Sequence, residues 1–406
     1  MSVERTSLMR GAAAVAVTCA VLAGAPAAPA VPADGSGAGT PLTRTDLRRE
    51  LERTLREAGY IGMSVEVRDG RRRTWASAGE ARLGGGRPVA RGERFRAASV
   101  TKTFTATVVL QLVAEGRLSL DDTVDHLLPG VVSGNGNDGS RITLRNLLQH
   151  TSGLYNYGPT GDTAADFERT RYDHLDAEES VARAVAHRPD FPPASADDPE
   201  PDWNYSNPNY LVAGMVVEKV TGRSWAEEVR DRIVRPLGLR DTYEPGDDPR
   251  IHGPHARTYQ RFPGSAEWTD TTERNMSMAS AAGSLISGER DLDRFFTALF
   301  DGRLLPPAQL AEMRRTVPAS AEIRQAFPAL DYGLGLMRQP LACGGHRWGH
   351  GGDLEGATVR TGFTEDGRRS VVITATGKRS GDEHLLRAER AVQRLTDLAL
   401  CGRPRS

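Results

Sequence analysis

The order of sequence patterns predicts a chain of the α/β class, in its α+β form, with strands near both ends and helices between them. Alternating apolar and polar residues predict two strands joined by a turn over 62–79, and two more over about 356–376. Apolar residues at helical spacing dominate from about 100 to 300. The 406 residues are enough for one large enzyme or two smaller units.

The first elements are a helix and a β-hairpin. Leu47, Leu51 and Leu55 recur at helical spacing in an otherwise charged segment, which predicts an amphipathic surface helix that stops at Gly59. The hairpin follows, and an Asp-Gly pair at 69–70 favours a tight turn between its strands.

A buried helix comes next, and it begins with a hydroxyl and an amine. Phe104, Val108 and Leu112 recur every four residues in an apolar run. Ser99 and Lys102 are three residues apart, so on one helix face their side chains can touch. A buried lysine that has lost its proton can activate a serine as a nucleophile. The S-x-x-K pattern is short, and the alternative is an ordinary turn with a solvated lysine.

The helical segment contains a polar turn and a long excursion. A helix over 144–154 ends at a glycine-capped turn, where we expect His150 to cap the helix rather than to act in catalysis. Residues 156–202 are rich in Pro, Asp and Ala, which predicts a surface excursion with one helix at 178–187.

A Tyr-x-Asn turn lies just ahead of an apolar helix. It contains Tyr205 and Asn207 within the stretch from Trp203 to Tyr210. A phenol can relay a proton to and from a serine oxygen, and an amide can orient a substrate carbonyl and a lysine. The alternative is a plain Asn-Pro turn with a core tyrosine.

The last third is predicted to contain a strand at 332–338, a glycine-rich stretch around His350 and a final helix at 381–399. Glycines beside His350 would let a ligand lie against bare backbone. His346 is four residues away, but the five glycines within 344–352 argue against a helical pair of metal ligands, so we expect no metal site.

Composition and the N-terminus bear on location and partners. The 52 basic and 53 acidic residues give a net charge of −1, which favours neither nucleic acid nor an anionic membrane as a partner. Arg5 and Arg10 precede an apolar run of 14 residues and Ala-Pro-Ala sites, which predicts a secretory signal peptide over 1–30. The run is shorter than the ~20 residues of a membrane span, and an uncleaved anchor is the alternative. We therefore expect a secreted, extracellular protein with a flexible linker at 31–41.

Two cysteines remain after removal of the predicted signal peptide, Cys343 and Cys401. An even pair in an exported chain predicts one disulfide. Two unpaired thiols are the alternative.

The three motifs together resemble those of the serine β-lactamase-like, penicillin-recognising hydrolases: S-x-x-K at 99–102, Y-x-N at 205–207 and a glycine-flanked His350. The chain is most similar to the streptomycete D-alanyl-D-alanine carboxypeptidases, which also resemble class C β-lactamases. This similarity runs from about residue 42 to residue 401.

The resemblance implies an antiparallel sheet flanked by helices, with an inserted, mostly helical lobe. It implies one hydrolase domain over 42–402. The sheet lobe would comprise about 42–96 and 300–402, and the helical lobe about 97–299.

The resemblance also implies an acyl-enzyme mechanism without a metal or an organic cofactor. Ser99 would be the nucleophile, and Lys102 and Tyr205 would share the proton transfers. Asn207 would orient the substrate amide and the lysine. His350 would lie across the cleft and contribute a donor toward the tyrosine or a substrate anion.

Further roles are expected for backbone groups near the third motif. The N–H groups of Ser99 and Asp353 would form the oxyanion hole, and Gly351, Gly352 and Trp203 would border the substrate. The carboxypeptidases have hydroxyls after the histidine that hold a terminal carboxylate, whereas this chain has Gly351 and Asp353 there. This departure puts a substrate with a free carboxylate in question.

The leading functional prediction is a D-alanyl-D-alanine carboxypeptidase-type peptidase. The alternatives are an esterase or D-aminopeptidase on the same scaffold, a β-lactamase, and a catalytically silent wall-binding protein. The expected partners are a small peptide, amide or ester substrate, including cell-wall peptide, with β-lactams as inhibitors and no membrane span.

Overall fold

A computed structural model describes residues 39–157, 163–195, 198 and 200–403. The predicted signal peptide and most of the predicted linker lie outside the described residues. The end of that linker, 39–41, is paired with the C-terminal segment: the Gly39 N–H donates to the Cys401 carbonyl at 2.7 Å, and Thr40 pairs with Arg403. The predicted linker therefore ends before Gly39, because these backbone hydrogen bonds fix the chain.

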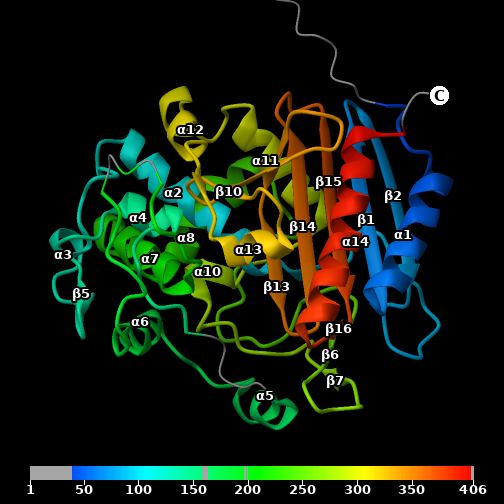
Figure 1. Ribbon diagram of the computed structural model, residues 1–406, viewed down its shortest axis with the longest axis horizontal. Helices are drawn as coiled ribbons and strands as arrows, with labels where there is room; N and C mark the ends of the chain where they lie inside the picture. Colours follow the sequence, from blue (N-terminus) through cyan, green and yellow to red (C-terminus); the bar gives the residue numbers. More distant parts are fainter. Residues whose placement is uncertain (1–38, 158–162, 196–197, 199, 404–406) are drawn as a thin grey trace, which may run out of the picture. The chain divides into compact units, whose positions relative to one another are not determined.

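The largest sheet is built from both ends of the chain (Figure 1). Its order is β2-β1-β15-β14-β12-β11-β10-β9, with β13 also paired to β14, and all pairings are antiparallel. The predicted antiparallel sheet is confirmed. The strands are β1 (Gly62–Asp69), β2 (Arg72–Gly79), β9 (Val317–Pro318), β10 (Asp331–Tyr332), β11 (Met337–Pro340), β12 (His346–Gly349), β13 (Gly351–Leu354), β14 (Ala357–Thr364) and β15 (Arg369–Thr376).

One face of this sheet is covered by α1 (Arg44–Ala58) and α14 (Asp382–Cys401), which pack against each other. Leu47 and Leu51 are fully buried in this layer with Val65 of β1. Gly59 caps α1 at φ 68°, a left-handed conformation that suits glycine. The amphipathic helix and its stop are therefore confirmed.

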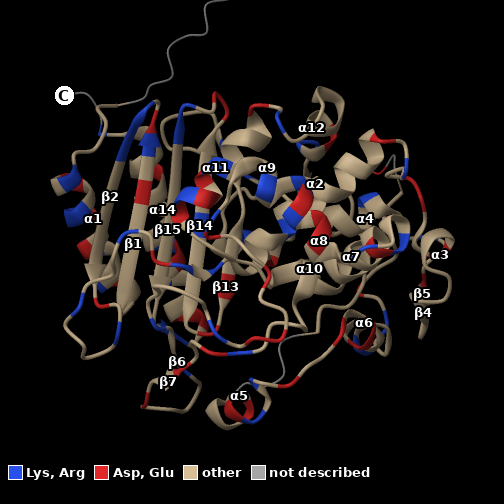
Figure 2. Cartoon of the chain, turned by 180° about the vertical axis from the view of Figure 1, so that it is seen from behind, with Lys and Arg blue, Asp and Glu red and all other residues tan. Residues whose placement is uncertain are grey.

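The opposite face is covered by α11 (Glu289–Phe300). Successive side chains of a strand point to opposite faces, and Ser64 and Arg68 of β1 bond to Glu289 and Asp293 of α11. Figure 2 shows acidic and basic residues intermixed over this region rather than separated into one-sign surfaces. Charge is thus neutralised locally, in agreement with the balanced composition.

The helical part is organised around α2 (Thr101–Ala114), which lies against α7 (Asn207–Thr221) and α10 (Ser280–Gly283). Phe104 of α2 stacks on Phe295 of α11 with ring centroids 3.7 Å apart. The remaining helices are η1 (Ala98–Val100), α3 (Val124–Leu127), α4 (Leu144–Gln149), α5 (Ala164–Thr170), α6 (Ala177–Val185), α8 (Trp225–Val229), η2 (Arg230–Val234), α9 (Arg235–Leu237), α12 (Pro307–Met313) and α13 (Ala321–Ala326).

The two expected lobes interlock. The helix α11 lies within the predicted helical lobe, 97–299, yet it packs on the sheet, and α12 lies within the predicted sheet lobe yet contacts α2. The two lobes can therefore not be separated at residues 97 and 299, because α11 packs on the sheet and α12 packs on α2.

The predicted strand at 332–338 is wrong in its middle. The chain turns between β10 and β11, and these two short strands pair with each other. Gly335 has φ 72° and lies directly on α2, where an added Cβ would be 2.7 Å from the Ala106 Cβ and 3.1 Å from the Lys102 carbonyl oxygen. Only a glycine allows this close approach, which fixes the turn against the start of α2.

Three small sheets complete the fold. The sheet β16-β6-β7 consists of β16 (Lys378–Arg379), β6 (Tyr259–Arg261) and β7 (Thr269–Asp270). The other two pair β3 (Phe95–Arg96) with β8 (Ile286–Ser287), and β4 (Ser133–Gly134) with β5 (Asn137–Asp138). Within the described residues, no helix combines the length and apolar character that crossing a bilayer requires.

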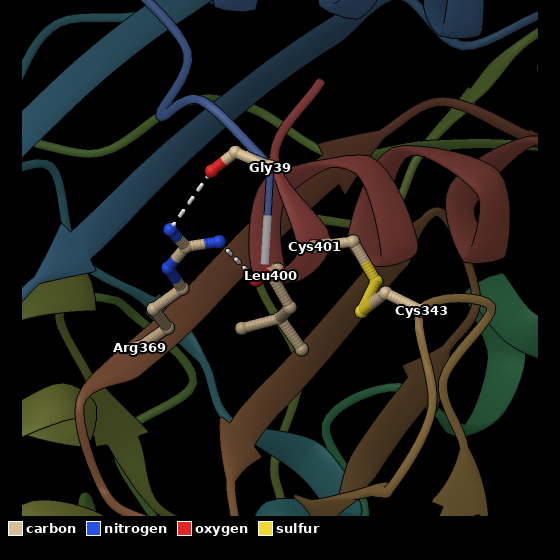
Figure 3. Close-up of a disulfide and its surroundings, with 5 residues drawn as sticks. All are labelled: Gly39, Cys343, Arg369, Leu400 and Cys401. Carbon is tan, nitrogen blue, oxygen red and sulfur yellow. Dashed lines mark hydrogen bonds between the residues drawn. A yellow bond between two sulfur atoms is a disulfide. The ribbon is translucent and has the colours of Figure 1, made fainter. Parts of the chain in front are cut away.

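A disulfide joins Cys343 to Cys401 at the end of α14, with Cα atoms 5.7 Å apart (Figure 3). The guanidinium of Arg369 donates to the Leu400 carbonyl at 2.9 Å and to the Gly39 carbonyl at 3.2 Å. The C-terminal helix is thus tied covalently to the 341–345 turn and by hydrogen bonds to β15 and the N-terminal end of the described chain.

Candidate active site

Ser99 lies in the short turn η1 that leads into α2. The preceding Ala98 has φ 49°, a left-handed conformation that is strained for alanine. The turn is held from behind, because the Ala97 N–H donates to the Leu285 carbonyl at 2.8 Å. Ser99 is therefore presented on a constrained turn at the start of a buried helix.

Lys102 is fully buried, and its Nζ contacts three oxygens. Nζ lies 2.7 Å from Asn207 Oδ1, 2.8 Å from the Ala282 carbonyl oxygen and 3.2 Å from Ser99 Oγ. Burial lowers the pKa of Lys102 well below its usual 10.5. A neutral amine has two protons and one lone pair. The amide and carbonyl oxygens can only accept, so they take both protons and leave the lone pair for the Ser99 hydroxyl.

Tyr205 meets the same serine from the other side. The Lys102 Nζ lies 4.8 Å from the centroid of its ring, and the side chain of Ser99 is one of the groups that act on the phenol. Burial raises the pKa of Tyr205 above its usual 10, although Ser99 acts in the opposite direction. The phenol therefore keeps its proton at neutral pH and can give it to a leaving group.

His350 does not lie where the motif resemblance implied. Its Nε2 is 2.8 Å from the Tyr332 hydroxyl and its Nδ1 is 2.5 Å from the Gly351 carbonyl oxygen. The ring is buried, 6.5 Å from the Tyr205 ring between centroids, and it does not line the cavity described below. Burial lowers the pKa of His350 to about 3, so the ring is neutral. The expectation of a donor across the cleft is wrong, because both ring nitrogens are bonded behind it.

Trp203 also lies behind the site rather than in it. It is buried, and its Nε1–H donates to the Gln149 carbonyl at 2.8 Å. The expected contact of Trp203 with substrate is wrong, since its indole packs against His150 and Tyr332 and is absent from the cavity wall.

Gly352 lies directly against the Ser99 turn. An added Cβ at this position would lie 2.4 Å from the Ala97 carbonyl oxygen and 3.2 Å from the Ser99 nitrogen. Neither Gly351 nor Gly352 is among the residues that line the cavity, and their expected contact with substrate stays a prediction. Gly352 lets β13 approach the serine turn, and this brings Asp353 to the cavity wall beside Ser99.

The side chain of Asp353 is neutralised by two cations. Its Oδ1 lies 2.9 Å from Lys378 Nζ and its Oδ2 lies 2.9 Å from Arg360 Nη1. Burial would raise the pKa of Asp353, but Arg360 and Lys378 outweigh this effect and lower it. The carboxylate is therefore ionised, and both of its oxygens are paired with cations. This pairing removes the repulsion that an unpaired aspartate would exert on a substrate carboxylate.

A cavity of about 440 Å³ opens in front of Ser99. Its polar wall includes Asn207, Asp353 and two cations, Arg274 and Lys378. Arg274 is ion-paired with Glu355, as Lys378 is with Asp353. Within the described residues, the basic side chains that line this cavity are thus all paired with carboxylates.

The rest of the wall is apolar. It includes Phe262, Met276, Met278, Leu354 and Leu385. Leu385 is 42 % exposed, one of three large apolar side chains with such exposure in the described chain. Exposed apolar surface inside a cavity beside a nucleophile indicates contact with an apolar part of a ligand.

The antiparallel sheet with inserted helices, together with the Ser99 and Lys102 turn, defines a β-lactamase-type serine hydrolase. The Beta-lactamase family model matches residues 47–396, so this chain belongs to that family. A D-stereospecific amidohydrolase from Streptomyces sp. is 40 % identical, with a TM-score of 0.78, over 89 % of this chain and 100 % of that one. D-amino acid amidase from Ochrobactrum anthropi SV3, complexed with D-phenylalanine, is 25 % identical with a TM-score of 0.72, over 88 % of this chain and 98 % of that one.

Curated relatives cover a smaller part of the chain. Penicillin-binding protein 4 of Amycolatopsis lactamdurans is 31 % identical over 59 % of this chain and 61 % of its own length. Esterase EstB of Burkholderia gladioli is 34 % identical over 47 % of this chain and 49 % of its own length.

Several residues at the site were not predicted from sequence. His150 was expected only as a cap, which it is, at φ 64° after α4, but its ring also packs against Tyr205 with centroids 4.4 Å apart. One feature of the sequence could have pointed to Lys378. The chain contains only three lysines against 49 arginines, and two of the three lie at this site. Tyr332 had no sequence signal, because its partner His350 is 18 positions away.

Proposed function

We propose that this chain is a serine amidohydrolase that cleaves amides of D-amino acids, with a neutral group rather than a free carboxylate on the leaving side. The observation that carries the proposal is the pairing of both cations in the cavity wall. A free carboxylate would need a cation, and Arg274 or Lys378 would first have to leave its own carboxylate. The 40 % identity to a D-stereospecific amidohydrolase supports the substrate class.

The proposed acylation begins at the Ser99 hydroxyl. Ser99 Oγ bonds to the substrate carbonyl carbon while its proton passes to the neutral Lys102 amine. The N–H groups of Ser99 and Asp353 stabilise the oxyanion. The leaving nitrogen takes the Tyr205 proton as the C–N bond breaks, and Lys102 then returns a proton to the phenol. Asn207 orients the substrate amide and the Lys102 amine relative to Ser99.

Deacylation would reverse the same transfers with water. Water replaces the leaving amine, gives a proton to the basic pair, and its oxygen bonds to the acyl carbon. The Ser99 Oγ–C bond then breaks and Ser99 regains a proton. These steps use side chains of the chain itself at each transfer.

The apolar wall supports an apolar substrate side chain. Phe262, Met276 and Leu385 would contact it, and burial of such a group favours binding by about 25 cal/mol per Å². An aromatic or branched D-residue fits this wall better than D-alanine does.

A D-alanyl-D-alanine carboxypeptidase is the second candidate. It is favoured by the 31 % identity to a penicillin-binding protein. An esterase is favoured in the same way by EstB. Both would use the same Ser99 chemistry and differ in the group that leaves.

The test compares turnover of D-phenylalanine amide, L-phenylalanine amide, a D-Ala-D-Ala peptide acid, its amide, and a short acyl ester. We expect the D-amide to be cleaved faster than the L-amide, and the peptide amide faster than the acid. Faster cleavage of the acid would contradict the proposal and favour the carboxypeptidase. Turnover by Ser99→Ala at the wild-type rate would contradict the nucleophile assignment.

We also propose that the protein is exported, which the N-terminal Arg, apolar and Ala-Pro-Ala pattern supports. N-terminal sequencing of the protein from culture medium and from cells tests this. Intact Met1 on all cell-associated protein, with none in the medium, would contradict it.

A further inference from the structure

We propose that His150 is a positioning residue for Tyr205, an inference that rests on the proposed acylation of Ser99. The ring does not line the cavity and does not touch substrate. It acts through the tyrosine, by holding both sides of the peptide segment that presents the phenol.

Backbone and ring of His150 bind the two residues that flank Tyr205. The Asn204 N–H donates to the His150 carbonyl at 3.2 Å. The Ser206 N–H donates to the His150 Nδ1, also at 3.2 Å. One residue therefore fixes the chain immediately before and immediately after the tyrosine.

The ring of His150 is set in one tautomer by its donors. A backbone N–H cannot accept, so the bond from Ser206 requires an unprotonated Nδ1 and leaves the proton on Nε2. Asn209 Nδ2 lies 3.2 Å from the same nitrogen, and Asn209 Oδ1 accepts from Ser152 Oγ at 2.6 Å. Burial, with lesser effects of Lys102 and His350, lowers the pKa of His150 well below its usual 6.5, so the acceptor stays available.

The ring also packs directly on the phenol. The His150 and Tyr205 ring centroids are 4.4 Å apart. Tyr332 and Trp203 close the other sides, with centroids 4.8 and 5.6 Å from His150, and the histidine is fully buried. Water is thereby excluded from this side of Tyr205, which contributes to the raised pKa of the phenol.

The backbone of His150 adopts a left-handed conformation. Its φ of 64° at the end of α4 suits glycine or asparagine. Glycine or asparagine would cap the helix equally well, and the histidine ring adds the bond to the Ser206 N–H and the contact with Tyr205.

The test measures the rate at which a fluorophosphonate labels Ser99 in the full chain, from pH 5 to about pH 11.5, because the raised pKa of Tyr205 places the alkaline limb of the wild type above pH 10. The probe needs only an activated serine, so it does not depend on the natural substrate. In His150→Gly the backbone is relaxed and the ring is lost. We expect labelling to slow about 10- to 100-fold, and the midpoint of its alkaline limb to move to lower pH as water reaches Tyr205.

His150→Asn is the rescue variant. Asparagine tolerates the left-handed conformation, and its Oδ1 takes the place of Nδ1 as acceptor from Ser206. We expect a labelling rate between those of His150→Gly and wild type. The alkaline midpoint should still be shifted, because asparagine does not cover the phenol.

Asn146→Ala is the matched control. Asn146 is a buried polar residue of the same helix, and the hydrogen bonds of its side chain go to Thr143, Thr151 and Ala194. We expect a lower melting temperature but a wild-type labelling rate and pH midpoint.

The outcomes separate this inference from the proposed function. Absence of labelling in the wild type would overturn the proposed function itself. Labelling of wild type and His150→Gly at equal rates with equal midpoints would overturn the positioning role alone. If His150→Gly does not fold, a folded His150→Asn with the wild-type rate and midpoint overturns it equally.

Discussion

The amine of Lys102 lies 2.7 Å from the side-chain oxygen of Asn207, although 105 positions separate the two residues. This oxygen can only accept, and it takes one proton of the neutral amine, as the Ala282 carbonyl takes the other. The lone pair is thereby left for Ser99. The amide thus determines which atom of the amine faces the nucleophile.

Lys102→Arg is expected to abolish the base while keeping a long nitrogen-containing side chain at this position. A guanidinium stays protonated at any working pH and cannot accept the Ser99 proton. We expect labelling of Ser99 by a fluorophosphonate to fall about 10²- to 10⁴-fold. Lys219→Arg, at an exposed position on α7, is the control and should label at the wild-type rate. Equal labelling of Lys102→Arg and wild type would contradict the assignment of the base.

Asn207→Asp keeps the shape of the side chain but places a carboxylate beside Lys102. A nearby negative charge favours the protonated amine, so the pKa of Lys102 rises. The base is then protonated at neutral pH, and we expect the acid limb of the kcat/KM profile to move to higher pH. A pH series of amide hydrolysis with wild type and variant checks this. A shift toward lower pH would contradict the proposed contact.

Gly352→Ala tests the close approach of β13 to the serine turn. The new Cβ would lie 2.4 Å from the Ala97 carbonyl oxygen, which is backbone and cannot move aside alone. We expect at least a tenfold loss of kcat, because an Ångström-scale displacement at a reacting centre can cost up to about 10²-fold. Gly367→Asn, in a turn with open space around its Cα, is the control. Full activity of Gly352→Ala would show that the turn can shift without consequence.

Glu289 is expected to make stability depend on pH. Burial raises its pKa from the usual 4.5 to about 7, despite bonds from Ser64 at 2.5 Å and Trp75 at 2.9 Å. A raised carboxyl pKa means that the folded state binds the proton more tightly than the unfolded state. Its contribution to stability is therefore complete below about pH 4.5 and lost as the pH rises to about 7.

Glu289→Gln removes this titration. We expect the free energy of unfolding of the variant, relative to wild type, to rise by up to about 3 kcal/mol between pH 4.5 and 7. Urea unfolding at several pH values measures it, with Glu52→Gln on the exposed face of α1 as control. A difference that is constant with pH would contradict the raised pKa.

The sequence predicted those parts of the fold that depend on neighbouring residues. The 62–79 hairpin and the helix capped by Gly59 follow from local pattern and turn chemistry. The contact of Ser99 with Lys102 follows from their three-residue spacing, and the structure has it at 3.2 Å. The strand at 332–338 was mispredicted because close packing of Gly335 on α2 overrides its local strand pattern.

The roles of His350 and Trp203 could not be predicted from the residues around their motifs. His350 was expected to contribute a donor across the cleft, but its partner is Tyr332 and its ring is buried. Trp203 was expected at the substrate and instead supports the turn beneath it. Burial and partner decide such roles, and neither is a property of the few residues around a motif.

The amino-acid order alone thus determined an α+β chain with strands near both ends, and the pairing of a serine with a lysine one helical turn away, because helical spacing and strand alternation are local properties of the chain. Only the tertiary structure decided that Asn207 would direct the amine, that His150 would hold Tyr205, and that every cavity cation would already be paired. Those contacts join distant segments, and their free energies depend on burial that arises only when the whole chain packs.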